Sequence, residues 1–484
     1  MAIIDPPVRA RAADEIALSA QLEYSIDYNN AARVIVETAV GEVPVVGVVL
    51  GAMVAIFWPD SGVDVWDEIK DQVEEVVDEK ISQQVWQNVS NSLAGLNNVL
   101  DDYVHAVQTY KNDPQVISEK WNTANALFLH DLPSFQSAGY EVLLLPLFAQ
   151  FANMHLSLLR DGGSGGGEWG WSSTVVDDVK HTLSRTVEQY GEYASAWYDQ
   201  GYQQAVDTAP SNSKKTEPFN SVNGYVREMT LTVLDFSILW PLFDLETYPD
   251  GGTVNNDREI YSDVVGTADD TGVHMPQDPP TEPLTSVTVW GWDRIDAAKV
   301  DYPEGGGPDG QTSTGRMGNS NGGSKEPPHG GTFTVAEYGD IVEVKSLAGD
   351  VMTALWFGFE DGSMTYKLGG NYGGGQTTIW SYPDEILSSI KIMGVSRYYG
   401  SANAAVFGFK FKDPDGTLEP EMMRLAYVND PGDSTPSQLA AKLGLKPEQG
   451  ELMERLAKEY RWDAVRAAGR ARRARRIKAR ARRS

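Results

Sequence analysis

The sequence predicts a multi-domain protein of α and β structure, with a helical bundle first and an all-β domain after it. Residues 142–159 form a long apolar run that only four polar side chains interrupt. From residue 65 to residue 240, apolar side chains recur every three or four positions, which is the spacing of amphipathic helices. Beyond residue 283 the sequence changes to short β-type runs separated by glycine.

Composition places the chain among globular proteins and argues against several kinds of site. Its 484 residues, 41% of them hydrophobic, are enough for two or three domains with substantial cores. It has no cysteine, so no thiolate site can form, and its six histidines are scattered without metal-ligand spacing. Two G-x-S-x-G matches, at 162–166 and 318–322, lack the preceding strand and following helix of a nucleophile elbow. The sequence therefore predicts no catalytic residue, no cofactor and no metal.

The charge of the chain is unevenly distributed. The net charge is −28, yet residues 461–484 carry eleven Lys or Arg against one Asp. Without this basic tail the chain is near −38, which argues against nucleic-acid binding by the main domains. The tail has three interpretations: a site for nucleic acid or anionic lipid, an extension that proteases remove, or an Arg/Ala tail without a selected role.

The first 29 residues are predicted to be a flexible leader. They show no amphipathic pattern and lack the basic-then-apolar order of a secretory signal, so we expect no signal peptide. Trypsin-like cleavage is expected near Arg9, Arg11 or Arg33 and in the Arg-rich tail, leaving a resistant core of about residues 30–420. The apolar run at 43–58 is too short for a membrane span and favours a core helix.

Helical periodicity continues up to the central apolar run. Residues 65–110 predict amphipathic helix, with Gly95 as a candidate break. Another helix is predicted over 114–130, and a turn at 132–140, containing Pro133 and Gly139, leads into the central helix.

The central helix, predicted over 141–160, is apolar on nearly all sides. It would rise about 28 Å, close to the ~30 Å hydrocarbon thickness of a bilayer. Such a helix is either the centre of a soluble bundle or a membrane span, and the surrounding helices favour a bundle centre that can convert into a span. The candidate membrane-inserting residues are Val142, Leu145, Phe148, Phe151, Leu156 and Leu159.

Polar residues of this helix and of the one before it have two interpretations. They would hydrogen-bond neighbouring helices in the soluble bundle, or line a water-filled lumen after insertion. The candidate pore-lining residues are Glu119, Asn122, Thr123, Gln150, Asn153 and Ser157. His155 lies on the apolar side of the central helix and is predicted to be a satisfied core histidine.

The stretch GGSGGG at 162–167 predicts a flexible connection after the central helix. Periodic apolar residues then predict helices over 176–197 and 225–240, the second ended by Pro241. With the earlier segments, these supply the six or seven helices that are needed to keep the central helix from water.

Three strings carry a resemblance to a known family. LLLPLFAQFANMHLSLLRDG at 143–162, followed by EWGWS at 168–172, resembles the central helix and following turn of the bacterial three-domain crystal (Cry) δ-endotoxins. VREMTLTVLDFSILWPLFDLETYP at 226–249 is similar to the last bundle helix of that family. REIYSDVVG at 258–266 is similar to the strand that enters its second domain. The resemblance covers about residues 30–266 and implies a pore-forming toxin that performs no bond-making chemistry.

The β region resembles the second domain of the same family and the jacalin-like lectins. Its strand-like runs are SVTVWGW, AAKVDY, IVEVKSL, MTALWFGF, SIKIMGV and AAVFGFKF. Three segments repeat a plan of strand, acidic turn and glycine, which suits a β-prism of three small sheets. The Gly-rich residues 303–331 are expected to form a long loop at one end.

Target recognition is predicted at loops of the β-prism, at 303–331, 359–376 and 396–404. The candidate receptor-loop residues are Tyr372, Trp380, Tyr398, Tyr399 and Asn403, and ordinary strand packing is the alternative for the aromatic ones. The nearest match to the jacalin-type G-x-x-x-D sugar loop, at 400–404, lacks the aspartate. This weakens the case for glycan binding by that mechanism, but not for protein recognition.

The expected organisation departs from the family at the C-terminal end. The family's third domain, a β-sandwich, has no room in the 67 residues after Thr417, which predict a helix over 437–462 and then the Arg/Ala tail. The predicted domains are a leader (1–29), a helical bundle (30–262), a linker (263–282), a β-prism (283–418) and a C-terminal extension (419–484).

These observations favour a pore-forming toxin that binds target cells through the β-prism and inserts a hairpin of the 114–130 and 142–160 helices. The resemblance implies insect gut cells as targets, a membrane and a surface receptor (protein or glycan) as partners, and a monomer in solution that oligomerises in the membrane. It also implies a cytoplasmic or crystal-inclusion protein of a bacterium, released on lysis. The alternative is a carbohydrate-binding or structural protein whose helical domain stays soluble, but such a protein has no need of a bilayer-long central helix.

Overall fold

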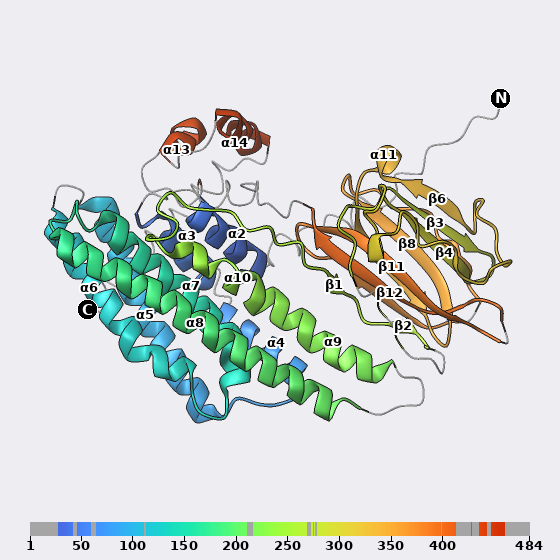
Figure 1. The fold of residues 1–484 in the computed structure, drawn as a ribbon, viewed down its shortest axis with the longest axis horizontal. Coiled ribbons are helices and arrows are strands. Elements are labelled where there is room, and N and C mark those ends of the chain that lie inside the picture. The colour runs from blue at the N-terminus through green and yellow to red at the C-terminus, as the bar shows by residue number, and fades with distance from the viewer. Residues whose placement is uncertain are drawn as a thin grey trace, which may run out of the picture.

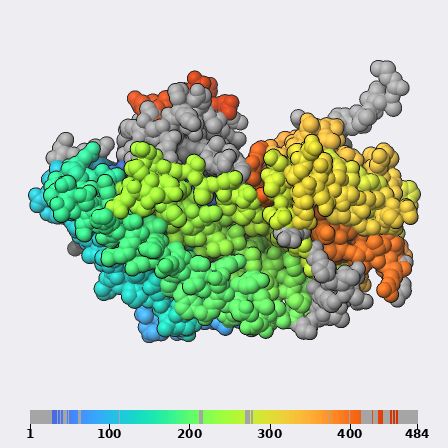
Figure 2. All heavy atoms as spheres, in the orientation of Figure 1, coloured from blue at the N-terminus to red at the C-terminus, as the bar shows by residue number. Residues whose placement is uncertain are grey.

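A computed structural model of the chain describes residues 28–41, 46–59, 64–110, 113–210, 216–268, 278–372, 374–397, 399–412, 435–442 and 447–459, with residues 273, 275 and 427. Within them a bundle of helices adjoins a domain of three β-sheets, and a further pair of helices lies beside the bundle (Figure 1). Figure 2 shows the bundle and the β domain as two lobes in direct contact. The predicted order of a helical bundle and then an all-β domain is confirmed.

The central apolar helix of the bundle is α7 (Glu141–Gly165). Around it lie α2 (Tyr28–Gly41), α3 (Val48–Phe57), α4 (Val65–Val77), α5 (Gln83–Thr109), α6 (Pro114–Phe135), α8 (Ser173–Thr208) and α9 (Glu217–Met229). α7 packs against α3, α4, α6 and α8, and one continuous core of buried apolar residues joins it to them. The central position that the sequence predicts for this helix is thus confirmed, and the apolar run at 43–58 contributes the core helix α3.

The segment at 65–110 folds as two helices, but Gly95 is not the break. α4 ends at Asp78, which has a left-handed backbone (φ 56°), and α5 starts after Ser82, whose side chain accepts a hydrogen bond from Val85 N. Gly95 lies inside α5, and its lack of a side chain leaves room for Leu127 of α6, whose Cδ2 would lie 3.3 Å from an added Cβ. Capping at 78–82 therefore divides the helix, while the glycine serves packing.

The turn between α6 and α7 is shorter than predicted. α6 continues through Pro133 to Phe135, because Phe135 is fully buried and completes the last helical turn. Residues 136–140 then make the connection, in which Gly139 has a positive φ of 81°. A hairpin of α6 and α7 would therefore turn at 136–140 rather than at 132–140.

The predicted flexible connection at 162–167 is wrong, because α7 continues through Gly165. Glycine is needed here for close packing. A Cβ on Gly162 would lie 2.7 Å from the Trp121 ring, and one on Gly163 would lie 2.7 Å from Leu245 Cδ1. The tertiary contacts thus keep these glycines helical despite their low intrinsic propensity.

The last bundle segment is not one continuous helix over 225–240. α9 begins at Glu217, a π-helical turn follows at Thr230–Leu234, and the short α10 covers Asp235–Ser237. Pro241 does not end the segment; it occupies the first turn of a 3₁₀ helix at Trp240–Phe243. After the π-helical turn, Asp235 pairs with Arg258 and the Trp240 indole donates a hydrogen bond to Asn153 of α7.

The β domain consists, over the residues that the structure describes, of three four-stranded antiparallel sheets around a common core. The first contains β1 (Ile260–Tyr261), β2 (Val265–Gly266), β11 (Glu385–Val395) and β12 (Ala402–Phe411). The second has the order β10 (Gln376–Trp380), β7 (Ile341–Ala348), β8 (Met352–Phe359) and β9 (Leu368–Gly369). The third has the order β5 (Met317–Gly318), β4 (Ile295–Asp301), β3 (Ser286–Gly291) and β6 (Gly331–Thr334). All six predicted strand-like runs fall on strands, and the three sheets form the predicted β-prism.

The β domain also takes up chain that lies before residue 283. β1 and β2 both pair with β12, with Ile260 opposite Phe409 and Val265 opposite Ala405. These two short strands lie within the predicted end of the bundle and the predicted linker. The strand that the family resemblance indicates at 258–266 is present as β1 and β2, whereas local sequence alone does not identify its pairing partner, which is far away in the chain.

The C-terminal helix predicted over 437–462 appears as two helices, α13 (Pro436–Lys442) and α14 (Pro447–Glu459). They pack on each other through buried Leu439, Ala440, Met453 and Ala457. The leader up to residue 27 and the basic tail lie outside the described residues.

Candidate functional site

The six candidate membrane-inserting residues of α7 are all buried inside the bundle. Val142 is 8% exposed, and Leu145, Phe148, Phe151, Leu156 and Leu159 are at most 1% exposed. Among the described helices, α7 is the one that is long and apolar enough to cross a membrane, and it is completely enclosed. In this state the bundle stores a bilayer-length helix away from water and lipid alike.

The polar line of α7 is hydrogen-bonded within the bundle. Asn153 donates from Nδ2 to Gln150 Oε1 (3.0 Å) and accepts a bond from the Trp240 indole nitrogen at Oδ1 (2.7 Å). Ser157 donates from Oγ to the Asn153 carbonyl (2.7 Å). The Gln150 Nε2 atom is buried without a hydrogen-bond partner. This line therefore fixes α7 against the last bundle segment, as the first interpretation of these residues requires.

His155 is the satisfied core histidine that the sequence predicts. Its Nδ1 lies 2.7 Å from the Tyr190 hydroxyl of α8, and its Nε2 lies 3.1 Å from Asn125 Oδ1 of α6. Its ring also stacks on Phe128 with centroids 4.8 Å apart. Burial lowers the pKa of His155 to about 3, so the ring is neutral and links α7 to both neighbouring helices.

A second set of polar contacts holds the C-terminal end of α7. Asp161 Oδ2 accepts hydrogen bonds from Gly47 N at the start of α3 (2.9 Å) and from the Tyr103 hydroxyl of α5 (3.0 Å). Arg160 donates from Nη1 to the Leu242 carbonyl (2.7 Å), and the Trp121 indole donates to the Leu158 carbonyl (2.7 Å). Burial raises the pKa of Asp161 to about 7 and lowers the pKa of Arg160 to about 10.

These contacts were missed at the sequence level, although a signal was present. An adjacent Arg and Asp at the end of an otherwise apolar helix must find partners if the helix is buried. The partners come from three segments that are distant in sequence, and only the fold identifies them.

The candidate pore-lining residues do not lie together. Glu119, Asn122 and Thr123 of α6 are exposed on the outside of the bundle, where the latter two hydrogen-bond to backbone carbonyls one turn earlier. Gln150, Asn153 and Ser157 are buried on α7. In this structure α6 thus presents these polar side chains on the outside of the bundle, while α7 directs its polar line into the protein.

The candidate receptor residues lie in three places, with Tyr398 outside the described residues. Tyr372 and Tyr399 are 68% and 55% exposed, and both rings lie over the guanidinium of Arg294. Trp380 instead packs against the β core and lies 5.3 Å from the Arg227 guanidinium of α9, so it belongs to the contact with the bundle. Asn403 lies on strand β12 beside β2, with its carbonyl accepting from Thr267 N (3.2 Å).

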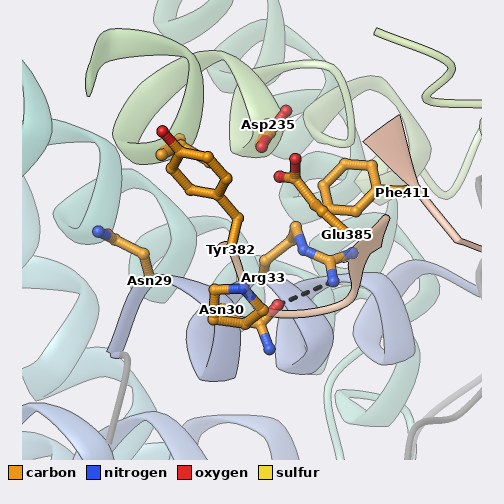
Figure 3. A pocket seen from close by; sticks show the side chains of 9 residues that line it. Asn29, Asn30, Arg33, Asp235, Tyr382, Glu385 and Phe411 are labelled. Carbon is orange, nitrogen blue, oxygen red and sulfur yellow. Dashed lines mark hydrogen bonds between the residues drawn. The ribbon is translucent and has the colours of Figure 1, made fainter. Parts of the chain in front are cut away.

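A network of ions joins the bundle to the β domain. Arg258 donates from Nη2 to Asp235 Oδ2 (2.6 Å) and to Glu385 Oε1 (2.7 Å). The guanidinium groups of Arg33 and Arg258 lie 4.2 and 4.1 Å from the centroid of the Phe411 ring. Figure 3 shows Arg33 from α2, Asp235 from α10, and Glu385 and Phe411 from the β domain around a small pocket at this junction.

The buried charges of this junction form ion pairs. These pairs involve residues of both domains, so they require the two domains to stay in contact. Asp235 and Glu385 have side chains that are 3% and 1% exposed, and Arg258 is the cation that both share. Burial raises the pKa of Glu385, against the opposing effect of Arg258. Separating the two domains would expose these charges or leave them unpaired.

Nothing in the described part of the chain resembles a metal centre, since no three His, Asp or Glu side chains there are grouped to hold an ion. The structure instead contains a buried apolar helix, the hydrogen bonds that hold this helix in the bundle, and exposed aromatic residues in loops of the β domain.

Comparisons with known proteins agree with this architecture. The family described as delta endotoxin, N-terminal domain, matches residues 35–244. The pesticidal crystal protein Cry19Ba of Bacillus thuringiensis subsp. higo is 34% identical over 245 residues, which are 48% of this chain and 35% of that protein. Cry26Aa of Bacillus thuringiensis subsp. finitimus is 34% identical over 215 residues, 43% of this chain and 18% of that protein. The chain thus matches about a third or less of the length of these curated relatives.

Solved structures extend the likeness of fold to both domains. The Bacillus thuringiensis insecticidal crystal protein Cry7Ca1 superposes with a TM-score of 0.67 at 20% identity, covering 81% of this chain and 76% of that one. Residues 35–244 of the helical domain thus match the delta endotoxin N-terminal family in sequence, and 81% of the chain shares the fold of an insecticidal crystal protein.

Proposed function

We propose that the protein is a pore-forming toxin that permeabilises target-cell membranes by inserting the α6–α7 hairpin. The observation that carries the proposal is α7 itself, which is bilayer-long, apolar and wholly enclosed by other helices. A helix satisfies its backbone hydrogen bonds internally, so α7 can move from the bundle into hydrocarbon without leaving unpaired amides. The proposed activity makes and breaks no covalent bond.

Insertion would require α7 to lose a defined set of contacts. Near its middle these are the hydrogen bonds of Asn153 with Trp240 and of His155 with Tyr190. At its C-terminal end they are the bonds of Asp161 with Tyr103 and Gly47. The described hydrogen bonds between α7 side chains and other helices thus lie at residue 153 and beyond. We infer that the 136–140 turn leads the movement, because the half of α7 beside it is held by apolar packing.

After insertion, the exposed polar residues of α6 would acquire a new role. Glu119, Asn122 and Thr123 are too polar to face lipid, so they would line water together with the polar line of α7. A single hairpin cannot enclose a channel, so the proposal includes oligomerisation in the membrane.

The β domain would direct the toxin to its target. The similar proteins Cry7Ca1 and Cry4Aa are described as insecticidal and mosquito-larvicidal, and we carry an insect target to this chain as part of the proposal. Exposed loops on a rigid scaffold are suited to recognising a surface receptor.

A disulfide across the bundle tests hairpin release. The chain has no native cysteine, so two engineered ones can pair only with each other. A Cβ on Gly201 of α8 would lie 2.7 Å from Cγ1 of Val142, the position that a cysteine sulfur at 142 would take. The Val142→Cys/Gly201→Cys variant joins α7 to α8 close to the 136–140 turn. We expect it to release dye from liposomes only after reduction.

The single variant Gly201→Cys is the matched control, since it crowds Tyr225 equally but forms no cross-link. It should leak to the same extent with and without reductant. Equal leakage by the oxidised and reduced double variant, with the disulfide confirmed by mass spectrometry, would refute hairpin release. Absence of leakage by the unmodified protein, with and without protease treatment, would contradict pore formation itself.

A further inference from the structure

His155 forms one hydrogen bond to α6 and one to α8, and these two bonds have different fates if α6 and α7 leave the bundle together. We propose that Asn125 of α6 stays bonded to His155 after insertion and positions the two helices of the hairpin in the bilayer, whereas the bond to Tyr190 of α8 is lost at release. The inference rests on the proposed function, the insertion of the α6–α7 hairpin. It adds a positioning residue and a contact that persists in the membrane.

His155 is the one residue with an ionisable side chain in the apolar run 142–159. In a neutral imidazole one nitrogen carries a proton and the other nitrogen accepts. The Nε2 atom lies 3.1 Å from Asn125 Oδ1, which can only accept, so Nε2 is the nitrogen that carries the proton. The Nδ1 atom, 2.7 Å from the Tyr190 hydroxyl, then accepts. Each ring nitrogen thus has one partner in the bundle, and the ring N–H depends on Asn125.

The depth of His155 in an inserted α7 makes an unpaired N–H unfavourable. The ring is about 7 Å along the helix axis from the middle of the run 142–159, at a rise of about 1.5 Å per residue. Half of the hydrocarbon thickness is about 15 Å, so the ring would lie inside the hydrocarbon when the run spans the bilayer. An N–H without a partner at that depth opposes insertion. The partner must therefore move with α7, and in the proposed hairpin α6 is the helix that does so.

The bond between Asn125 and His155 is one of a series of contacts that run along the α6–α7 interface. Trp121 of α6 donates from its indole nitrogen to the Leu158 carbonyl (2.7 Å). One helical turn further along α6, Asn125 accepts from His155, and the Phe128 ring then stacks on the same imidazole with centroids 4.8 Å apart. Residue numbers rise along α6 as they fall along α7, which is the order of an antiparallel pair. The two helices are therefore in hairpin register before release.

Tyr190 belongs to the part of the bundle that the proposed movement leaves behind. Its hydroxyl is bonded to His155, and its ring lies edge-on to Phe148 of α7 with centroids 5.2 Å apart. Both contacts end when α7 moves away from α8. The bond to Tyr190 therefore stabilises the soluble bundle alone, whereas the bond to Asn125 stabilises both the bundle and the inserted hairpin.

Two matched variants of the full chain each remove one hydrogen bond of His155. Tyr190→Phe removes the hydroxyl and keeps the ring, and Asn125→Leu removes the acceptor at a similar side-chain volume. Both should lower the urea midpoint of the protein in solution, because each leaves a buried polar atom without a partner.

The rate of dye release from phosphatidylcholine liposomes should separate the two variants. We expect Tyr190→Phe to release dye faster than the unmodified protein, because a contact of the bundle alone is lost. Asn125→Leu should release dye roughly tenfold more slowly, because the His155 N–H enters the bilayer unpaired. A role of Asn125 in the bundle alone predicts the opposite sign, since a loosened bundle releases the hairpin more readily.

A rescue variant tests whether the unpaired N–H causes the slower release. Asn125→Leu/His155→Phe removes both polar partners, so it should release dye at least as fast as the unmodified protein. Circular dichroism confirms that each variant is folded, and Asn125→Ala takes the place of Asn125→Leu if the larger side chain prevents folding.

Unchanged or faster dye release by Asn125→Leu, while the unmodified protein leaks, would overturn the inference and leave pore formation intact. A slowed Asn125→Leu variant that His155→Phe does not restore would equally reject the unpaired N–H as the cause. Absence of leakage by the unmodified protein counts against the proposed function itself, and this inference falls with it.

Discussion

Replacing Asp161 by asparagine should make the bundle more stable at alkaline pH and remove part of its pH dependence. Asp161 is 4% exposed at the C-terminal end of α7, and both of its hydrogen bonds reach the same oxygen, Oδ2. Asparagine is nearly isosteric, and with its Oδ1 in that place it accepts the same bonds from Gly47 N and the Tyr103 hydroxyl. The substitution therefore removes the buried charge and keeps the contacts.

The magnitude follows from the difference between the two pKa values of Asp161. Burial raises its pKa from 3.8 to about 7 in the folded protein, so the folded state binds the proton more tightly than the unfolded state does. Its contribution to stability is fully present below pH 3.8 and is lost progressively as the pH rises to about 7. The full loss is about 4 kcal/mol, of which about 3 kcal/mol falls between pH 5 and pH 9.

Urea denaturation followed by circular dichroism at pH 5 and pH 9 measures this effect. Other groups titrate as well, so the informative quantity is the difference between Asp161→Asn and the unmodified protein at each pH. That difference should move in favour of the variant by about 3 kcal/mol between pH 5 and pH 9. A difference that is the same at both pH values would show that Asp161 is not a buried carboxyl whose charge opposes folding.

The remaining predictions concern packing, the domain junction and proteolysis. Gly162→Ala should lower the free energy of unfolding by about 1–2 kcal/mol, because the added Cβ would clash with the Trp121 ring. Gly191→Ala, with open space around its Cβ, should raise the free energy of unfolding by about 0.5–1 kcal/mol, and the urea midpoints of the two variants show whether each change has the expected sign. Arg258→Ala should cost about 3–5 kcal/mol, since it leaves two buried carboxylates without their shared cation, and an unchanged melting temperature would contradict the pairing. Limited trypsin digestion should spare Arg33, which is 8% exposed and ion-paired, and a mass-spectrometric product that begins immediately after it would show that α2 opens readily.

The last of these predictions corrects an expectation drawn from the sequence. The sequence predicts cleavage near Arg33 as well as near Arg9 and Arg11, because an arginine near the N-terminus is exposed unless tertiary contacts bury it. In the structure its guanidinium hydrogen-bonds Glu37 and Asp384 and lies over Phe411. Asp384 and Phe411 come from the opposite end of the described chain, and local sequence carries no sign of them.

The parts of the fold that could be predicted are those set by local periodicity. α7 is predictable from its long apolar run, the helices around it from their 3.6-residue repeat, and the six β runs from short β-type segments separated by glycine. The glycines at 162–165 show the limit of this reasoning. Their composition indicates a loop, yet Trp121 and Leu245 require small residues on a helix at those positions. Helix propensity is a weak prior that close packing overrides.

The candidate site was predictable in kind but not in arrangement. Exposed aromatic residues were expected in the β loops, and Tyr372 and Tyr399 lie there, but Trp380 has the same composition signal and faces the bundle. Trp292 carries no distinct signal because it is the last residue of the strand-like run SVTVWGW. Arg294, whose guanidinium lies near the rings of Tyr372 and Tyr399, could be recognised only from the contacts of the folded domain.

The pairing of β1 and β2 with β12 has a consequence for the order in which the chain folds during synthesis. Ile260 pairs with Phe409, which lies 149 positions later in the chain. The first sheet of the prism therefore cannot form until nearly the whole described chain has left the ribosome. The helical bundle needs no contact beyond about residue 252 to enclose α7. Helices form from local contacts much faster than long-range strand pairs do. The nascent chain can therefore sequester its most aggregation-prone segment before the β domain exists, and a released fragment ending shortly after residue 260 should already protect α7 from hydrogen exchange.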